Sequence, residues 1–457
     1  MNSENRFSLD LDGAAGLVTG SLLLAITLVI FIGTQIGIRV TAQLPANNTL
    51  GPYEALTLVF SEPVDESLAI EKFFIQPDIK GKFEWADAKT MRFVPLEPFE
   101  PDTQYTLALS PGVLTGTGQS LKKPQNWKFQ TRSPQVVYLV AEQQKSRLWM
   151  VDTTGGSSTP LTDDTFQIFD FDTSRNGEFV VFAAFNEQNG IDLWRVQRTG
   201  GTATLLLQCG PDRCSVPAIS PGDRMVAYVR EAAAPTNQLA YGSPRIWVLN
   251  LETRQNAPLY EDKQIIGYGP TWSPDGSRLS SYDGIKDEIR LLDLITGNQL
   301  TIPSQLGSPV TWSGDGETFI YTDIDSIEAN IHTRVLEAKI SINEISTLFG
   351  DNDQWDYAYN VLAWSPVENK LLLGLRPAAN DPSMALWLMD PYNRDGQVIV
   401  EQPGYSYNNP YWDPWGKALL FQQFKLKGVY KPEIALWMPG FNQPQVLAEG
   451  LMPHWLP

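Results

Sequence analysis

Along most of the chain, short runs of alternating apolar and polar residues are separated by Gly, Pro, Asn and Asp. Such runs predict β-strands, because successive side chains of a strand point to opposite faces of its sheet. One segment differs. From Gly13 to Ile38 no charged residue occurs, and this run exceeds the roughly 20 residues that an α-helix needs to cross a bilayer. The pattern predicts an all-β protein that follows a short tail at 1–12 and a transmembrane helix at 13–38.

The apolar run at 13–38 is either an uncleaved membrane anchor or a secretory signal. Its length and a leader in which Arg6 is the only basic residue favour the anchor. Residues 40–42 (VTA) loosely resemble a cleavage site. Arg6 and Arg39, the basic residues that flank the run, do not decide its orientation. We place the C-terminal bulk outside the cytoplasm because of the domain types that follow.

Residues 45–132 contain period-two runs such as ALTLVFS, TMRFVPL and QYTLALS. About seven short strands in roughly 90 residues are typical of a β-sandwich. The segment resembles the bacterial Ig-like domain of the SbsA type, which occurs in surface and envelope proteins. The resemblance is carried by 60–65 (FSEPVD), 93–95 (FVP) and 101–107 (PDTQYTL). It implies a spacer between the membrane and the rest of the chain, without chemistry of its own.

From residue 133 onward the chain repeats a core of the form Pro-x-Trp-Ser-Pro-Asp-Gly, followed by an apolar strand. The clearest copies lie at 270–276 and 310–316. The residues at the tryptophan position of successive copies are Thr173, Ile219, Trp272, Trp312, Trp364, Trp412 and Trp455. They follow one another at intervals of about 40–50 residues, the length of known β-propeller repeats. We expect these tryptophans to pack between blades.

The two ends of the repeat region complement each other. The first unit lacks its opening core and begins with VVYLVA at 136–141, while a surplus core stands at 452–457. If both belong to one blade, the C-terminal strand closes the ring and leaves no open sheet edge. Seven blades result. Residues 133–457 resemble the WD-repeat-like propellers of TolB and of dipeptidyl peptidases. Six blades, the usual number in TolB-type propellers, stay the alternative.

Charge and cysteine content narrow the possible partners. The formal net charge is −18 and no run is rich in Lys or Arg, which excludes nucleic acid as a partner. Cys209 and Cys214, the only cysteines, lie in a loop with Gly and Pro. This spacing favours a disulfide over two free thiols. The two histidines lie far from both cysteines in sequence, so we predict no zinc site.

Long connections are expected on one face of the propeller, opposite the short Gly-containing turns. Two of them, 351–360 and 403–411, are rich in aromatic residues. The rings that could stack on a sugar or a peptide are those of Trp355, Tyr357, Tyr359, Tyr405 and Tyr407. Alternatively, these rings pack the connections against their own blades. Asp351, Asp353 and Asp356 lack the Gly and the distal Glu of a known calcium loop, so no metal site is predicted.

These observations predict a membrane-anchored, extracytoplasmic binding or scaffold protein of the bacterial envelope. Its partners would be the membrane, through the N-terminal helix, and a protein or a glycan, through the long-connection face of the propeller. No nucleophile motif is recognisable, so neither an enzyme nor a cofactor is predicted. The alternative is a propeller hydrolase or lyase acting on polysaccharide or peptide, because paired Asp and Glu residues leave almost no sequence signature. A subunit of a larger membrane complex is a third possibility.

Overall fold

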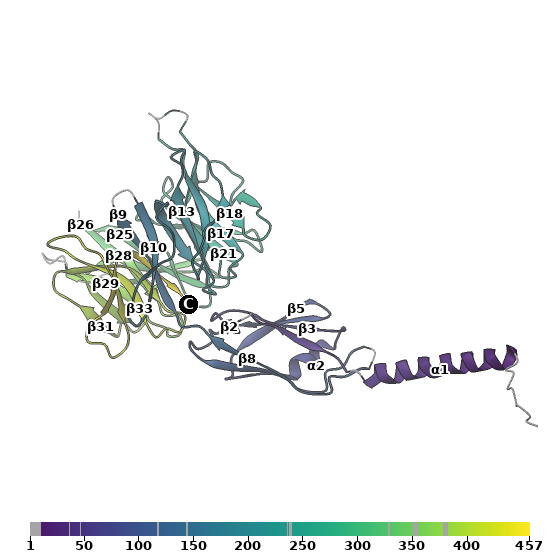
Figure 1. Ribbon diagram of the computed structural model, residues 1–457. Coiled ribbons are helices and arrows are strands. Elements are labelled where there is room, and N and C mark those ends of the chain that lie inside the picture. Colours follow the sequence, from purple (N-terminus) through teal and green to yellow (C-terminus); the bar gives the residue numbers. More distant parts are fainter. Residues whose placement is uncertain are drawn as a thin grey trace, which may run out of the picture. The chain divides into compact units, whose positions relative to one another are not determined.

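The computed structural model describes residues 11–35, 37–45, 47–116, 118–142, 145–234, 236, 240–327, 330–350, 355–377 and 383–457. The chain divides into two compact units, Met1–Thr131 and Arg132–Pro457. Figure 1 shows them coloured along the sequence. The boundary lies at the position where the strand pattern of the Ig-like segment gives way to the repeat.

The segment predicted to cross the membrane forms a helix, α1 (Leu11–Gln35). Small and polar residues interrupt its apolar run. The hydroxyls of Thr19 and Thr27 donate to the carbonyl oxygens of Ala15 and Leu23 one turn earlier, at 2.8 and 2.7 Å. A search of the described residues finds no helix that is both long and apolar enough to cross a membrane. The helix predicted at 13–38 is therefore confirmed over 13–35, and its crossing of a membrane is not supported.

After α1, the first unit contains a sandwich of two four-stranded sheets. One sheet has the order β1 (Val40–Gln43), β3 (Leu56–Phe60), β6 (Thr90–Pro95) and β5 (Gly81–Asp87). The other has the order β2 (Thr49–Leu50), β8 (Gln125–Thr131), β7 (Gln104–Leu109) and β4 (Phe73–Gln76). A short helix, α2 (Glu66–Glu71), follows β3 and is capped by Asp65. Strand alternation buries every second residue, as in β3 and β7, and the two inner faces form one core.

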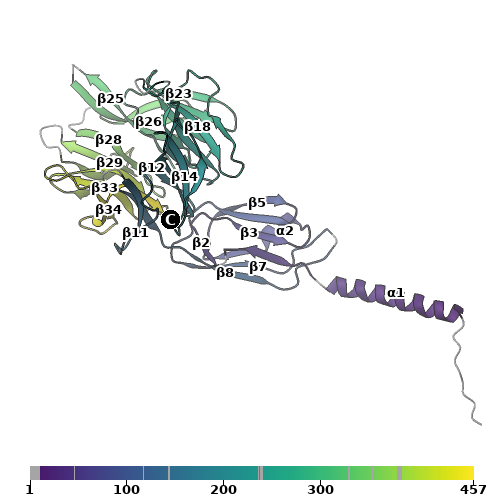
Figure 2. The same ribbon diagram turned by 45° about the horizontal axis from the view of Figure 1, so that its top comes forward.

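The second unit consists of four-stranded blades arranged around a common axis (Figure 1 and Figure 2). A parallel bridge between Ile191 and Arg213 joins the second and third of them into one eight-stranded sheet. Blade 1 contains β36 (Leu451–Leu456), β9 (Gln135–Glu142), β10 (Lys145–Asp152) and β11 (Thr159–Pro160). Blade 2 contains β12 (Ile168–Thr173), β13 (Phe179–Phe185), β14 (Ile191–Gln197) and β15 (Thr204–Leu207). Blade 3 contains β16 (Arg213–Ile219), β17 (Met225–Glu231), β18 (Arg245–Asn250) and β19 (Asn256–Pro258). Blade 4 contains β20 (Tyr268–Trp272), β21 (Arg278–Asp283), β22 (Glu288–Asp293) and β23 (Gln299–Pro303).

The remaining blades have the same antiparallel order. Blade 5 contains β24 (Thr311–Trp312), β25 (Thr318–Ile327), β26 (Asn330–Lys339) and β27 (Glu344–Phe349). Blade 6 contains β28 (Trp355–Trp364), β29 (Leu371–Pro377), β30 (Ala385–Met389) and β31 (Gly396–Glu401). Blade 7 contains β32 (Tyr405–Trp412), β33 (Leu419–Lys425), β34 (Glu433–Trp437) and β35 (Gln445–Glu449). The described strands thus form seven blades. The number predicted from the repeat is confirmed, and the alternative of six blades is not.

The ring closes through β36, which pairs antiparallel with β9 and supplies the first strand of blade 1. Blade 2 holds this strand from the other side. The guanidinium of Arg198 donates from Nη1 to the carbonyl oxygens of Leu456 and Pro457, both at 2.8 Å. The hydroxyl of Thr173 donates to the carbonyl oxygen of Trp455 at 2.7 Å. The predicted closure by the C-terminal strand is therefore confirmed.

The repeated core forms the turn between the first and second strands of a blade. In blade 4 the buried hydroxyl of Ser273 donates to Asp275 Oδ1 at 2.6 Å and accepts from the N–H of Arg278 at 2.9 Å. The equivalent Ser313 donates to Asp315, and this bond helps to hold the pKa of Asp315 below its usual value. The Ser and Asp of the repeat are therefore structural residues.

The tryptophans of the repeat join neighbouring blades. Trp272 Nε1 donates to the carbonyl oxygen of Ala218 in blade 3, and Trp455 Nε1 donates to that of Tyr411 in blade 7, both at 2.9 Å. Trp272 and Trp312 are buried. The interpretation of these residues as packing between blades is confirmed.

Candidate functional site at the centre of the propeller

Two of the five predicted ligand-binding rings lie in the core. Tyr357 is buried and its ring lies 6.0 Å from that of Phe349. Tyr407 is also buried, with its ring 5.5 Å from that of Phe421. The physical reason is that the two aromatic stretches are mainly strands, β28 and β32, and not the loops that we expected. Strand alternation directs these two rings inward, so neither ring is accessible for stacking in this structure.

Of the other three predicted rings, that of Tyr405 is partly exposed, and those of Trp355 and Tyr359 lie outside the described residues. Tyr405 is half-buried, and the ammonium of Lys425 lies 5.8 Å from its ring centroid. The side chains of Trp355, Tyr359 and Asp356 and all of 351–354 lie outside the described residues. Within the described part of the chain, no group of three or more His, Cys, Asp or Glu side chains could hold a metal ion.

The first strands of the blades line the centre of the ring, and most of them contact the first strands beside them, as β12 contacts β16 and β36, and β32 contacts β28 and β36. The residue just before the repeated tryptophan position occupies the same place in every blade, which we call the central position. In blades 1 to 7 it is held in turn by His454, Asp172, Ala218, Thr271, Thr311, Ala363 and Tyr411. Side chains that can carry a charge or donate a phenolic proton thus fall on the adjacent blades 7, 1 and 2.

These three residues, together with Asp170 on β12, form a continuous group that we call the polar sector. His454 Nδ1 lies 3.4 Å from Asp172 Oδ1. The imidazole ring lies 4.6 Å from the ring of Tyr411 and 4.9 Å from that of Phe171, measured between centroids. Tyr411 keeps 38% of its surface exposed. Three strands that are distant in sequence therefore bring an imidazole, two carboxylates and a phenol together.

The two carboxylates of the polar sector differ in how well they are compensated. Asp172 accepts from the N–H of Ile219 in blade 3 at 2.7 Å and from that of Thr173 at 2.8 Å, in addition to its contact with His454. Asp170 accepts from the N–H of Phe171 at 2.8 Å, its one hydrogen bond among the described residues. Burial raises the pKa of Asp170 to about 6. The hydrogen bond from the N–H of Phe171 and the nearby His454 act against this shift, while the charge of Asp172 adds to it.

A further carboxylate, Asp223, lies in the turn between β16 and β17 of blade 3 and contacts the equivalent turn of blade 2. Asp223 accepts from the N–H groups of Arg175 and Asn176 at 2.7 and 3.0 Å. Burial raises its pKa to about 6 as well, and Asp172 contributes in the same direction. Asp223 therefore joins the turns of blades 2 and 3.

A bend recurs in the first strands. Their pairing register shifts between Ser215 and Ala218, Tyr268 and Thr271, Asn408 and Tyr411, and Leu451 and His454. At each shift one residue has a positive φ of 48–53°: these residues are Val216, Gly269, Asn409 and Met452. Such bulges bend a strand and redirect its side chains. In each of these blades the central position comes two residues after the residue with positive φ.

Exposed aromatic residues lie at the end of the ring where the first strands begin. Phe169 and Phe185 are exposed by 48% and 36%, and their rings meet edge to face at 6.1 Å. Tyr268 in blade 4 is exposed by 46%. Beside it lies a cavity of about 50 Å³, whose lining includes Ser280 and Ser308. We call Phe169, Phe185 and Tyr268 the aromatic rim.

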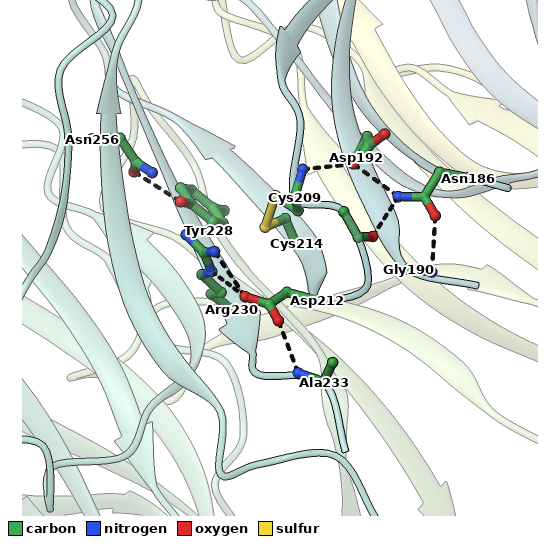
Figure 3. Close-up of a disulfide and its surroundings, with 11 residues drawn as sticks. Asn186, Gly190, Asp192, Cys209, Asp212, Cys214, Tyr228, Arg230, Ala233 and Asn256 are labelled. Atoms are coloured by element: carbon green, nitrogen blue, oxygen red, sulfur yellow. Dashed lines mark hydrogen bonds and ion pairs between the residues drawn. A yellow bond between two sulfur atoms is a disulfide. The ribbon is translucent and has the colours of Figure 1, made fainter. Parts of the chain in front are cut away.

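The loop between β15 and β16 lies at the same end and is cross-linked and hydrogen-bonded (Figure 3). Cys209 and Cys214 form the predicted disulfide across it. Within the loop closed by the disulfide, Asp212 accepts from Arg230 Nη2 at 2.7 Å and from the N–H of Ala233 at 2.8 Å. The N–H of Cys209 donates to Asp192 at 2.7 Å. The disulfide loop thereby fixes the start of the long connection between β17 and β18.

The sequence interpretation missed the polar sector, although the signal was present. Aligning the repeats on their tryptophan position places Tyr411, His454 and Asp172 in one column. In that column the other four blades carry only Ala or Thr. When some copies of a repeat carry a different kind of residue at one position, that residue is a candidate for a functional role. A stretch rich in aromatic residues is not a comparable signal, because such rings also fill the core.

Comparison with known proteins identifies parts of this architecture. The family model described as bacterial Ig-like domain matches residues 34–131. A comparison with curated proteins finds no match. Among solved structures, the chain is similar to TolB from Acinetobacter baumannii, at 14% identity and a TM-score of 0.42 over 71% of this chain and 83% of that one.

Two other similar structures are enzymes. One is an oligogalacturonate lyase in complex with manganese, at 12% identity and a TM-score of 0.50 over 89% of this chain and 97% of that one. The other is a puromycin-hydrolysing peptidase from Mycobacterium tuberculosis, at 15% identity and a TM-score of 0.50 over 69% of this chain and 53% of that one. At these identities the likeness shows the fold alone.

Proposed function

We propose that the protein is a scaffold of the bacterial envelope, whose propeller binds a protein partner at the end of the ring that carries the aromatic rim. The observation that carries this proposal is the exposure of Phe169, Phe185 and Tyr268. These residues lie on first and second strands of the blades, and the blades belong to a closed ring. Aromatic side chains on a rigid frame are typical anchors of protein interfaces. The disulfide loop at the same end adds a fixed border.

Binding rather than catalysis fits the polar side chains of this region. Asp172 is occupied by two backbone N–H groups and by His454, so it has a structural role in joining blades 1, 2 and 3. Three of the roughly four lone-pair sites of this carboxylate are thereby engaged, which leaves it little capacity to act as a general base. A glycan is the second ligand class that exposed aromatic rings suit.

The experiment is photo-crosslinking in envelope preparations with a benzophenone amino acid placed at position 169 or 268. We expect a discrete protein adduct from both positions. The matched control carries the same amino acid at Ile295 or Ile342, which are exposed by 81% and 61% in turns at the opposite end. Equal adducts from the two ends, or adducts from the control positions alone, would refute the proposed face. A glycan adduct in place of a protein would reassign the partner class.

We also propose that α1 attaches the chain to the membrane and that the units after it lie outside the cytoplasm. Support comes from the absence of charge between Gly13 and Ile38 and from exposed side chains such as Leu24, at 71%. The disulfide adds support because such bonds persist in oxidising compartments.

Fractionation of cells after an alkaline wash tests the attachment. We expect the full chain in the membrane pellet and a variant with Leu22, Leu23 and Leu24 replaced by Ser in the supernatant. Thiol trapping in intact cells tests the compartment. Reduced Cys209 and Cys214 would overturn the extracytoplasmic location, while an unchanged distribution of the serine variant would overturn the role of α1.

A further inference from the structure

The polar sector carries an uncompensated negative charge. At neutral pH its two carboxylates face one imidazole, and that imidazole contacts Asp172. Within the described residues, no Lys or Arg forms an ion pair with Asp170. A carboxylate that is partly removed from water is costly unless a positive group approaches it. The raised pKa of Asp170 is consistent with this missing counter-charge.

Short side chains and an aromatic surface accompany this charge. In the rest of the ring, the central positions of blades 3 to 6 carry only the short, neutral side chains Ala218, Thr271, Thr311 and Ala363. Tyr411 is partly exposed beside the carboxylates. A ring of this kind attracts organic cations through its π-face. A metal ion is a poorer candidate, because the described residues offer no group of three suitable ligands.

We propose that the polar sector binds one ammonium or guanidinium group, carried by a lysine or arginine side chain of the partner, against Asp170 and the ring of Tyr411. The inference rests on the proposed scaffold function and names the chemistry that the centre of the ring recognises. Asp170 supplies the charge, Tyr411 supplies the aromatic surface, and Asp172 and His454 hold the three strands in place. A partner segment with an acidic residue at this point would be rejected.

The probe is a fluorescein-labelled pentapeptide with a central arginine between glycines, compared with the same peptide that carries citrulline. Citrulline keeps the shape of arginine and lacks its charge. We expect the full chain to bind the arginine peptide at least tenfold more tightly at pH 7.5, measured by fluorescence anisotropy. Asp170→Asn should lower the affinity for the arginine peptide about tenfold, because the amide keeps the acceptor for the N–H of Phe171 and loses the charge. Tyr411→Leu should lower it too.

The matched control is Asp395→Asn, which removes one exposed carboxylate from a turn of blade 6 and leaves the net charge equal to that of Asp170→Asn. It should leave binding unchanged. Affinity of the parent chain should also fall as the pH drops through about 6, because protonation removes the charge of Asp170. The groups that face Asp170 are Asp172, His454 and Tyr411, so any pH dependence left in Asp170→Asn comes from them.

Equal binding of the two peptides, an equal loss in Asp395→Asn, or no binding of the arginine peptide would overturn the inference. These results are independent of crosslinking at the aromatic rim. Adducts at 169 and 268 without arginine binding would leave the scaffold function standing and remove the cation site. Arginine binding without adducts would do the reverse.

Discussion

Replacing Gly177 with alanine is expected to weaken the closure of the ring. Gly177 lies in the turn of blade 2 and has a φ of +70°, a conformation that costs an L-residue about 1–2 kcal/mol. A Cβ at this position would lie only 1.6 Å from the carbonyl oxygen of Pro457 and 2.7 Å from its carbonyl carbon. Backbone atoms cannot yield at such distances without moving the end of β36.

The displaced atoms are those that Arg198 holds. Its Nη1 donates to Leu456 and Pro457, both at 2.8 Å, and hydrogen bonds to a charged group contribute about 1.5–3 kcal/mol each. Loss of one such bond, added to the backbone strain, gives an expected destabilisation of about 2.5–5 kcal/mol for Gly177→Ala.

The matched control is Gly276→Ala in the equivalent turn of blade 4. Gly276 has a similar φ of +74°, and the nearest atom to its Cβ would be a Pro221 side-chain carbon at 3.5 Å, an ordinary contact. Only the backbone cost of about 1–2 kcal/mol should remain. Subtracting the control from the test variant isolates the contribution of the closure.

Urea unfolding followed by tryptophan fluorescence measures both variants. All but two of the 14 tryptophans, Trp85 and Trp127, lie in the propeller unit, so the signal reports on that unit. In a chain that lacks Pro457, Gly177→Ala should cost no more than Gly276→Ala. Equal destabilisation of the two alanine variants in the full chain would refute the role assigned to Gly177.

Three further changes test the propeller. Replacing Cys209 and Cys214 together with serine should destabilise the unit by about 2 kcal/mol, because the bond closes a short loop, and an unchanged urea midpoint would contradict this. Ser273→Ala should cost about 1–3 kcal/mol, since it removes a buried acceptor from the N–H of Arg278. Ser277→Ala serves as control, because the half-buried Ser277 donates to Asp275 at 2.6 Å in the same turn and its loss leaves the N–H of Arg278 paired; an equal effect would refute the assignment. The raised pKa of Asp170 stabilises the fold below the ordinary pKa of 3.8, and this stabilisation is lost as the pH rises through about 6. Asp170→Asn should therefore stabilise the chain by up to about 2 kcal/mol at pH 8, allowing for partial exposure, and hardly at all near pH 4; the same difference at both pH values would count against it.

The repeat could be predicted because each copy performs the same task. Trp272 and Trp455 donate to the blade before them, and Ser273 and Ser313 close the same turn. Residues with a shared structural role recur at one spacing, which a single sequence displays. The same reasoning found the closing strand, since a surplus core and a missing core must be complementary.

The site could not be predicted from local composition. Tyr357 and Tyr407 stand in aromatic stretches that continue as strands, and alternation then buries their rings. The polar sector has no local signature at all. His454 and Asp172 contact each other only because the ring closes, so their proximity depends on the register of the blades and on a strand from the far end of the repeat region.

The closure also sets an order of events during synthesis. Thr173 and Trp455, whose hydrogen bond joins blades 2 and 1, are 282 residues apart, while the other blades pair strands that follow one another along the chain. Until β36 emerges, β9 has an unpaired edge that invites aggregation, and loop closure over this distance is slow. His454 arrives on that last strand. A nascent or truncated propeller therefore lacks the polar sector. Only a chain that has completed folding could bind the proposed partner at the centre.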